Sequence, residues 1–181
     1  MSVDDDGLID VRVVIDAAAL ERLAPMDAIA PLWWGVQPSI DVAAWKAGLA
    51  PYTRPQQLVY AMVWHGAEAG NGGHDQFFWN TTGIVWRDAL EGYREARIGD
   101  VAALLAAAVA RMGGDPPLEK VARCQLMNFK KPNFDDMDDA FFPILNGDLN
   151  DRIMHYVRNH AADFAFDGVV RLMPELTAFS G

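Results

Sequence analysis

Apolar residues recur every three or four positions over much of the chain, which is the spacing of one face of an α-helix. The clearest run begins after Asp100 and ends at Gly113, a residue type that often stops helices. Its apolar stripe consists of Val101, Leu104, Leu105, Ala108, Val109 and Met112. The same spacing predicts helices over residues 86–93 and 149–164, and shorter ones near Asp16, Asp27, Ser39 and Leu118. The pattern is that of a mainly helical protein.

A second long helix is marked at its start by capping residues. Thr53 is a good N-cap, and Gln56, three residues later, completes a capping box. Between Leu58 and Ala69 only His65 and Glu68 are strongly polar. A helix that is apolar on all sides is expected to be buried. We therefore predict a central helix that ends near residue 69.

The two ends of the chain have β character. Val and Ile dominate residues 9–15, and residues 169–172 follow the turn-forming pair Asp167-Gly168. We predict that these segments pair as a small two-stranded ribbon. Since no repeat or linker interrupts the chain, residues 1–181 are expected to form a single domain of mainly α, helical bundle-like fold.

Composition agrees with a packed globular protein. The chain has 181 residues, of which 51% are hydrophobic, and its single cysteine, Cys124, has no partner for an internal disulfide. The N-terminus is acidic where a secretory signal would be basic and then apolar. The longest strongly apolar stretch, residues 101–110, is shorter than the roughly 20 residues that cross a bilayer. We expect a cytoplasmic protein without membrane association.

Negative charge is concentrated at the two ends. Residues 1–27 hold seven acids and two bases, residues 28–131 nine and ten, and residues 132–181 nine and three, within a net charge of −10. A concentrated excess creates a directional field that attracts a basic partner and disfavours direct binding to nucleic acid. The predicted acidic binding surface consists of Asp4, Asp5, Asp6, Asp10, Asp135, Asp136, Asp138, Asp139, Asp148 and Asp151. The alternative is that these are solvated turns and helix N-termini.

A polar, glycine-rich block spans residues 68–83. Its glycines permit backbone N–H groups to converge on an anion, and Glu68, at the end of the predicted helix, needs such donors. In the structural interpretation, Glu68 accepts from these amides and Gln76 and Asn80 tie neighbouring turns, while adjacent aromatic residues anchor the block in the core.

The functional alternative for this block is a pocket that binds a metal or activates water. Its candidate residues are His65, Glu68, His74 and Asp75. Their spacing lacks the second histidine of the zinc-protease pattern, and the glycines fit neither the dinucleotide fingerprint nor the phosphate loop. A nucleophile elbow is missing too. We therefore predict no catalytic residues, no metal and no cofactor, and expect that the protein is not an enzyme.

The block, EAGNGGHDQFFWNTTG, resembles the core signature of a bacterial family that includes an acidic DNA-mimic protein. The matching positions are Glu68, Asn71, Gly72, Gly73, Gln76, Phe77, Phe78, Asn80 and Gly83, whereas Gly70 stands where the family often has Asn. Residues 137–142 and 149–164 resemble the family's acidic, aromatic segment and closing helix. The resemblance implies a mainly helical fold, often a homodimer, and mimicry of nucleic acid by surface carboxylates, although most members have no assigned activity.

Three functions follow. The first is an acidic protein-binding module, a DNA mimic that occupies the nucleic-acid-binding surface of a basic partner such as a transcription regulator. It requires that carboxylates from the two ends of the chain meet on one rigid surface. The second is an immunity or antitoxin-like protein that neutralises a toxin, and the third is a metal-dependent hydrolase built on the pocket residues above.

Overall fold

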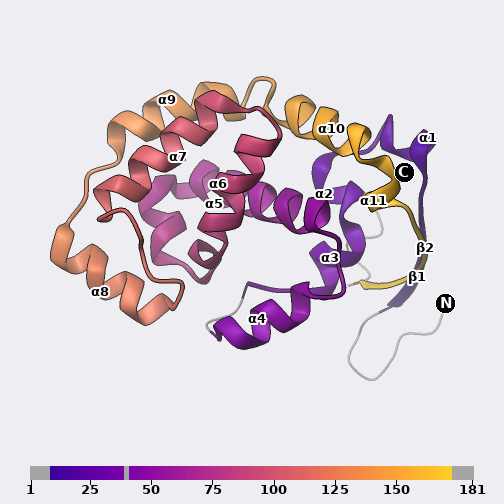
Figure 1. The fold of residues 1–181 in the computed structure, drawn as a ribbon, viewed down its shortest axis with the longest axis horizontal. Coiled ribbons are helices and arrows are strands. Elements are labelled where there is room, and N and C mark those ends of the chain that lie inside the picture. Colours follow the sequence, from indigo (N-terminus) through magenta and orange to yellow (C-terminus); the bar gives the residue numbers. More distant parts are fainter. Residues whose placement is uncertain (1–8, 39–40, 173–181) are drawn as a thin grey trace.

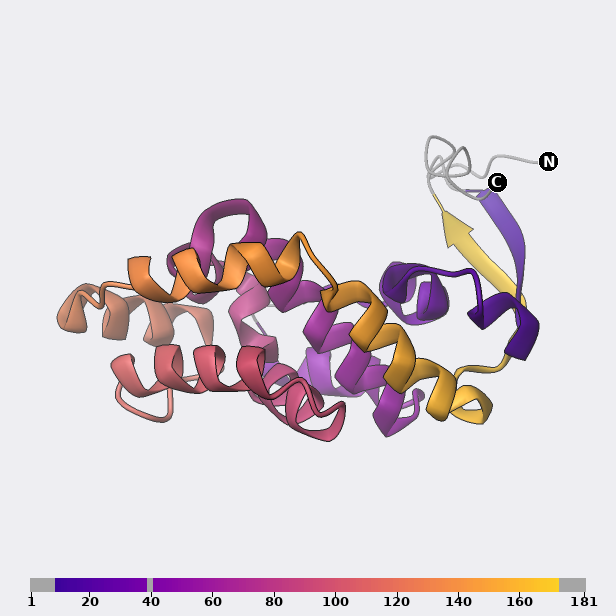
Figure 2. The same cartoon turned by 90° about the horizontal axis from the view of Figure 1, so that it is seen from above.

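The protein is elongated, and its longest helix runs through the middle (Figures 1 and 2). The computed structural model describes residues 9–38 and 41–172. In chain order the elements are β1 (Ile9–Ile15), α1 (Ala17–Leu20), α2 (Pro25–Ala28), α3 (Ala30–Gly35), α4 (Val42–Leu49), α5 (Arg54–Trp79), the 3₁₀-helix η1 (Thr81–Val85), α6 (Trp86–Glu95), α7 (Gly99–Arg111), α8 (Lys120–Lys130), α9 (Asp135–Leu145), α10 (Leu149–Asn159), α11 (Ala161–Phe164) and β2 (Phe166–Leu172). The predicted mainly helical fold is confirmed.

Helix α5 is the centre of the fold, as predicted. Thr53 accepts from the backbone of Gln56, whose side chain binds back to the backbone of Thr53, so the capping box is present. Helices α2, α3, α6, α8, α9, α10 and α11 all contact α5. The prediction that α5 ends near residue 69 is wrong: it continues to Trp79 through a kink at Gly72 and Gly73.

The terminal ribbon is confirmed. Strands β1 and β2 are antiparallel, with Ile9 opposite Leu172 and Ile15 opposite Phe166. Strand β2 begins three residues before its predicted start, because Asp167 lies inside the ladder and accepts two hydrogen bonds from Arg12 on β1. The ribbon packs against α3 and lies at one end of the elongated molecule (Figure 2).

Two parts of the C-terminal half differ from the prediction. The stretch 149–164 is not one helix: it breaks at His160, where φ is −119° and ψ is 28°. The Asp-rich stretch forms α9, for which no helix was predicted. Met137 and Phe141, four residues apart, face the core, whereas most of the acids face solvent. Helices α9 and α10 then follow one another along one long side of the molecule (Figures 1 and 2).

Buried apolar side chains from nearly every element form one core cluster, which reaches from Ile15 beside the ribbon to Met127 on α8. Aromatic residues make up much of it around the kink in α5, where Phe77 and Phe78 are fully buried. Over the residues that are described, no helix is long and apolar enough to cross a membrane.

Candidate functional site

The kink in α5 is built around a carboxylate from α9. Asp138 Oδ1 accepts from the backbone N–H of His74 at 2.9 Å and from its ring Nδ1 at 2.5 Å. Gly73 has φ +72°, and a Cβ there would overlap the Asp138 carboxylate. A glycine at this position is therefore required by both the backbone conformation and the approach of Asp138. The contact fixes α9 to the centre of the fold.

A chain of hydrogen bonds continues from His74 into the core. His74 Nε2 lies 3.4 Å from His65 Nε2, and His65 Nδ1 lies 3.0 Å from the Tyr93 hydroxyl. That hydroxyl is also 3.1 Å from the carbonyl oxygen of Met62. Both imidazoles are fully buried, and this burial lowers the pKa of His65 well below its ordinary value and lowers that of His74 less, because Asp138 opposes the shift.

The proton positions follow from this chain. An ionised Asp138 requires the proton of a neutral His74 on Nδ1, so His74 Nε2 accepts from His65 Nε2–H. His65 Nδ1 then accepts from the Tyr93 hydroxyl. If Tyr93 instead donates to Met62, His65 Nδ1–H donates to Tyr93, and the His65–His74 contact is a hydrogen bond only when His74 holds a second proton. The neutral arrangement is the one that burial favours.

Glu68 lies on the other side of the kink. Its Oε2 accepts from the side-chain amides of Gln76 at 3.0 Å and Asn80 at 2.9 Å. The predicted acceptance from glycine-loop amides is therefore replaced by side-chain donors, because the helix continues past the glycines instead of forming a loop. The three polar residues of the motif therefore satisfy one another, although the donors to Glu68 differ from the predicted ones.

Arg123 of α8 is a buried cation that the sequence did not reveal. It is 0% exposed and donates to four carbonyl oxygens: Phe78 at 2.7 Å, Asn80 at 2.6 Å, Pro117 at 3.1 Å and Leu118 at 2.6 Å. The first two belong to the end of α5, where carbonyls lack helical partners and the helix dipole is negative. Burial lowers the pKa of Arg123 to about 10, so the guanidinium is still charged at neutral pH.

Gly83 of the motif has its explanation in Arg123. A Cβ at Gly83 would lie 2.6 Å from the Arg123 Nε and 2.6 Å from the Phe77 carbonyl oxygen. A side chain there would displace the guanidinium from the end of α5. No local pattern could have paired these residues, since 40 positions separate them.

The four proposed metal-pocket residues are not brought together. His65 and His74 meet, but Glu68 is bound by Gln76 and Asn80, and Asp75 is exposed. The carboxylate beside the histidines is Asp138. Across residues 9–38 and 41–172, no group of three His, Cys, Asp or Glu side chains is arranged to hold a metal ion. The metal-site grouping is therefore wrong.

The predicted acidic residues are divided between two places. Asp4, Asp5 and Asp6 lie outside the described residues. Asp10 lies on the ribbon, 3.5 Å from Arg171, at the far end of the molecule from the start of α9 (Figure 2). Because β1 pairs with β2, the ribbon carries Asp10 away from α9, and the expected convergence of the two acidic ends is not seen in the described part of the chain.

The other acids lie in the first half of α9 and at the start of α10. Asp138 turns inward to His74 with 16% of its side chain exposed and so belongs to the buried chain instead of the surface. The exposed members form what we call the α9–α10 strip: Asp135, Asp136, Asp139, Asp148 and Asp151. Two of them have basic neighbours, since Asp136 is 2.6 Å from Arg111 and Asp148 is 3.6 Å from Arg152.

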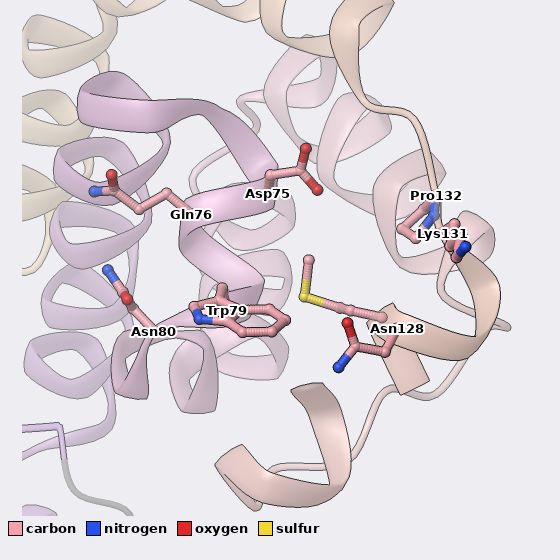
Figure 3. A pocket seen from close by; sticks show the side chains of 8 residues that line it. Asp75, Gln76, Trp79, Asn80, Asn128, Lys131 and Pro132 are labelled. Atoms are coloured by element: carbon pink, nitrogen blue, oxygen red, sulfur yellow. The ribbon is translucent and has the colours of Figure 1, made fainter. Parts of the chain in front are cut away.

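A groove of about 500 Å³ lies next to the start of α9, and we call it the α5–α8 groove. Asp75, Gln76 and Trp79 line it from the last turns of α5, and Asn128 and Lys131 from the end of α8 (Figure 3). Asp75 and Trp79 are four residues apart and so share one face of the helix. The aromatic residues of the block, Phe77, Phe78 and Trp79, were all predicted to anchor it in the core, but Trp79 is 45% exposed.

Comparison with known proteins gives one match. The model of the DMP19-like protein family matches residues 50–160, which include the kinked helix α5, Arg123, α9 and all of α10. Neither the curated proteins nor the solved structures contain a match. The match covers more than half of the chain, so this protein belongs to the DMP19-like protein family.

Proposed function

We propose that the protein binds a basic, nucleic-acid-binding protein, such as a transcription regulator, and that carboxylates of the α9–α10 strip stand where phosphates would stand. The single observation that carries the proposal is the strip itself. Its five exposed Asp side chains lie on two consecutive helices, and residues 132–151 contain no Lys or Arg. Membership of a family related to a DNA mimic supports the same conclusion.

Rigid presentation distinguishes a mimic from a merely acidic surface. Asp places its carboxylate close to the backbone, and the backbone of α9 is fixed to α5 by the two hydrogen bonds from His74 to Asp138. Arg111 fixes α9 further through Asp136 and through the carbonyl of Asn133. The strip is therefore held by the core of the protein instead of by flexible side chains.

The charge density of the strip sets the expected strength of binding. The stretch from Asp135 to Asp151 is helical except for residues 146–148, and its 16 residue-to-residue steps span about 24 Å at 1.5 Å per residue. Duplex DNA carries about one charge per 1.7 Å, or about 14 over that length. The strip has five carboxylates, of which two lie beside Arg111 and Arg152, so one copy supplies at most about a third of the charge. A homodimer with adjacent strips would double it, and we include such a dimer in the proposal.

The test measures how the α9–α10 strip contributes to binding. A basic DNA-binding partner is purified from cells that naturally make the protein, and its affinity is measured over a range of salt concentrations. We expect Asp139→Asn/Asp151→Asn to weaken binding roughly 2- to 30-fold, because each exposed charge contributes about 0.2–1 kcal/mol. The affinity should also fall steeply with salt, and less steeply for the double variant.

The matched control is Glu21→Gln/Glu119→Gln, which removes the same charge from exposed positions on other elements. It should bind nearly as the unchanged protein does. Equal weakening by both double variants would mean that net charge, and not the strip, drives binding. A salt-insensitive complex with a toxin would favour the immunity-protein hypothesis instead.

A further inference from the structure

The α5–α8 groove contains two groups that attract cations. Asp75 is exposed and has no Lys or Arg within ion-pair distance among residues 9–38 and 41–172, whereas Asp88, Asp100 and Asp136 each pair with an Arg. The pKa of Asp75 is raised, mainly by partial burial and then by the nearby carboxylates of Asp138 and Asp135. A cation placed beside it would relieve this repulsion.

Trp79 supplies the second group. Its ring makes no contact with another aromatic ring in the described part of the chain, whereas Trp33 and Trp64 stack on each other at 4.5 Å. The face of an indole attracts a guanidinium. The protein already contains one such pair, because the Arg87 guanidinium lies 5.2 Å from the centre of the Trp86 ring. Trp79 is an exposed indole without that partner.

We propose that the α5–α8 groove is a socket for an arginine side chain of the basic partner, an inference that rests on the proposed function. The guanidinium would stack on the Trp79 indole and donate to the Asp75 carboxylate, one helical turn away on the same face. The side-chain amide oxygen of Asn128, which also lines the groove, could accept one of its remaining N–H groups.

Charge and position both favour an arginine over an anion. Lys131 is the one cation among the residues that line the groove, and it lies on the α8 side, across from Asp75 (Figure 3). The carboxylates of Asp135 and Asp138 add to that of Asp75 on the other side. Since Asp135 is the first residue of the α9–α10 strip, the groove continues that surface. An arginine anchored there would hold a partner whose other basic groups meet the strip.

The experiment uses nona-arginine as the probe and nona-lysine as a comparison of equal charge. Binding to the full-length protein is measured by calorimetry at low salt, and the indole N–H signal of Trp79 is followed by NMR, assigned from its loss in Trp79→Leu. We expect nona-arginine to shift this signal. Trp79→Leu and Asp75→Asn should each weaken nona-arginine binding roughly 3- to 10-fold, with a smaller effect of Trp79→Leu on nona-lysine.

The controls are Phe129→Leu, which removes an aromatic side chain that is 83% exposed on α8 but does not line the groove, and Glu119→Gln. Both should bind nona-arginine as the unchanged protein does. Unchanged binding by Trp79→Leu would overturn the socket. If Asp139→Asn/Asp151→Asn still weakened binding in that case, the proposed function would stand without the socket. If the unchanged protein bound neither peptide, both proposals would fail.

Discussion

Replacing Arg123 with methionine is expected to lower the free energy of unfolding by about 3–5 kcal/mol. The substitution keeps an unbranched apolar stem but removes all four hydrogen bonds to backbone carbonyls. Those at the end of α5 would be left buried without a donor, and unsatisfied buried groups are costly. Urea unfolding followed by circular dichroism measures the change.

Two further variants make this prediction specific. Arg123→Lys keeps the charge but cannot reproduce the planar fork of donors, so it should lie between methionine and the unchanged protein. Arg87→Met makes the same chemical change at a side chain that is 50% exposed, and its effect should be small. If the free energy of unfolding of Arg123→Met lay within about 1 kcal/mol of that of the unchanged protein, the guanidinium would not be an essential connection between α5 and α8.

Acidification from pH 7 to pH 5 is expected to destabilise the fold through its buried histidines. Burial lowers the folded-state pKa of His65 and His74 below the ordinary value of about 6.5. Above that pH both states hold neutral imidazoles and these residues cause no pH dependence. Below it the unfolded chain binds protons that the folded protein does not, so stability falls as the pH falls. His65 alone should account for about 2 kcal/mol at pH 5.

His74 should contribute less than His65. Its Nδ1 faces Asp138. A second proton on His74 Nε2 can be donated to His65 Nε2 if His65 Nδ1 donates to Tyr93 and Tyr93 donates to Met62. The measurement is the free energy of unfolding at several pH values between 5 and 7. His65→Gln should flatten this profile, whereas His155→Gln, at an exposed position on α10, should leave it unchanged. Equal stability at pH 5 and pH 7 would contradict the neutral assignment of the buried pair.

Most helices and the terminal ribbon could be predicted because the sequence patterns that indicate them are local. Apolar spacing fixed the stripe of α7, and Thr53 with Gln56 marked the start of α5. The end of α5 was misjudged because consecutive glycines usually end a helix. Here Asp138, 64 residues away in sequence from His74, binds the backbone N–H at the kink and lets the helix resume. Such a distant partner leaves no trace in the local pattern.

The same reason explains what was missed in the candidate site. His65 and His74 were recognised as chemically interesting, but their carboxylate neighbour is Asp138 instead of Asp75. The kink in α5 turns His74 towards the core, where Asp138 meets it, and turns Asp75 towards the α5–α8 groove. Arg123 looked like an ordinary helical Arg, since its carbonyl partners lie up to 45 residues away. The motif glycines Gly73 and Gly83 gained their explanation only when Asp138 and Arg123 were placed beside them.

Charge segregation was visible in sequence, but its arrangement in space was not. The paired terminal strands place Asp10 at one end of the molecule, so the described acidic surface depends on α9 and α10 (Figure 2). Competition with DNA tests this account most directly. A labelled operator duplex bound to its regulator is titrated with the protein, and fluorescence anisotropy reports release of the duplex. If the protein mimics DNA, the duplex is displaced and no regulator molecule binds duplex and protein together; a stable ternary complex of all three would contradict this mimicry.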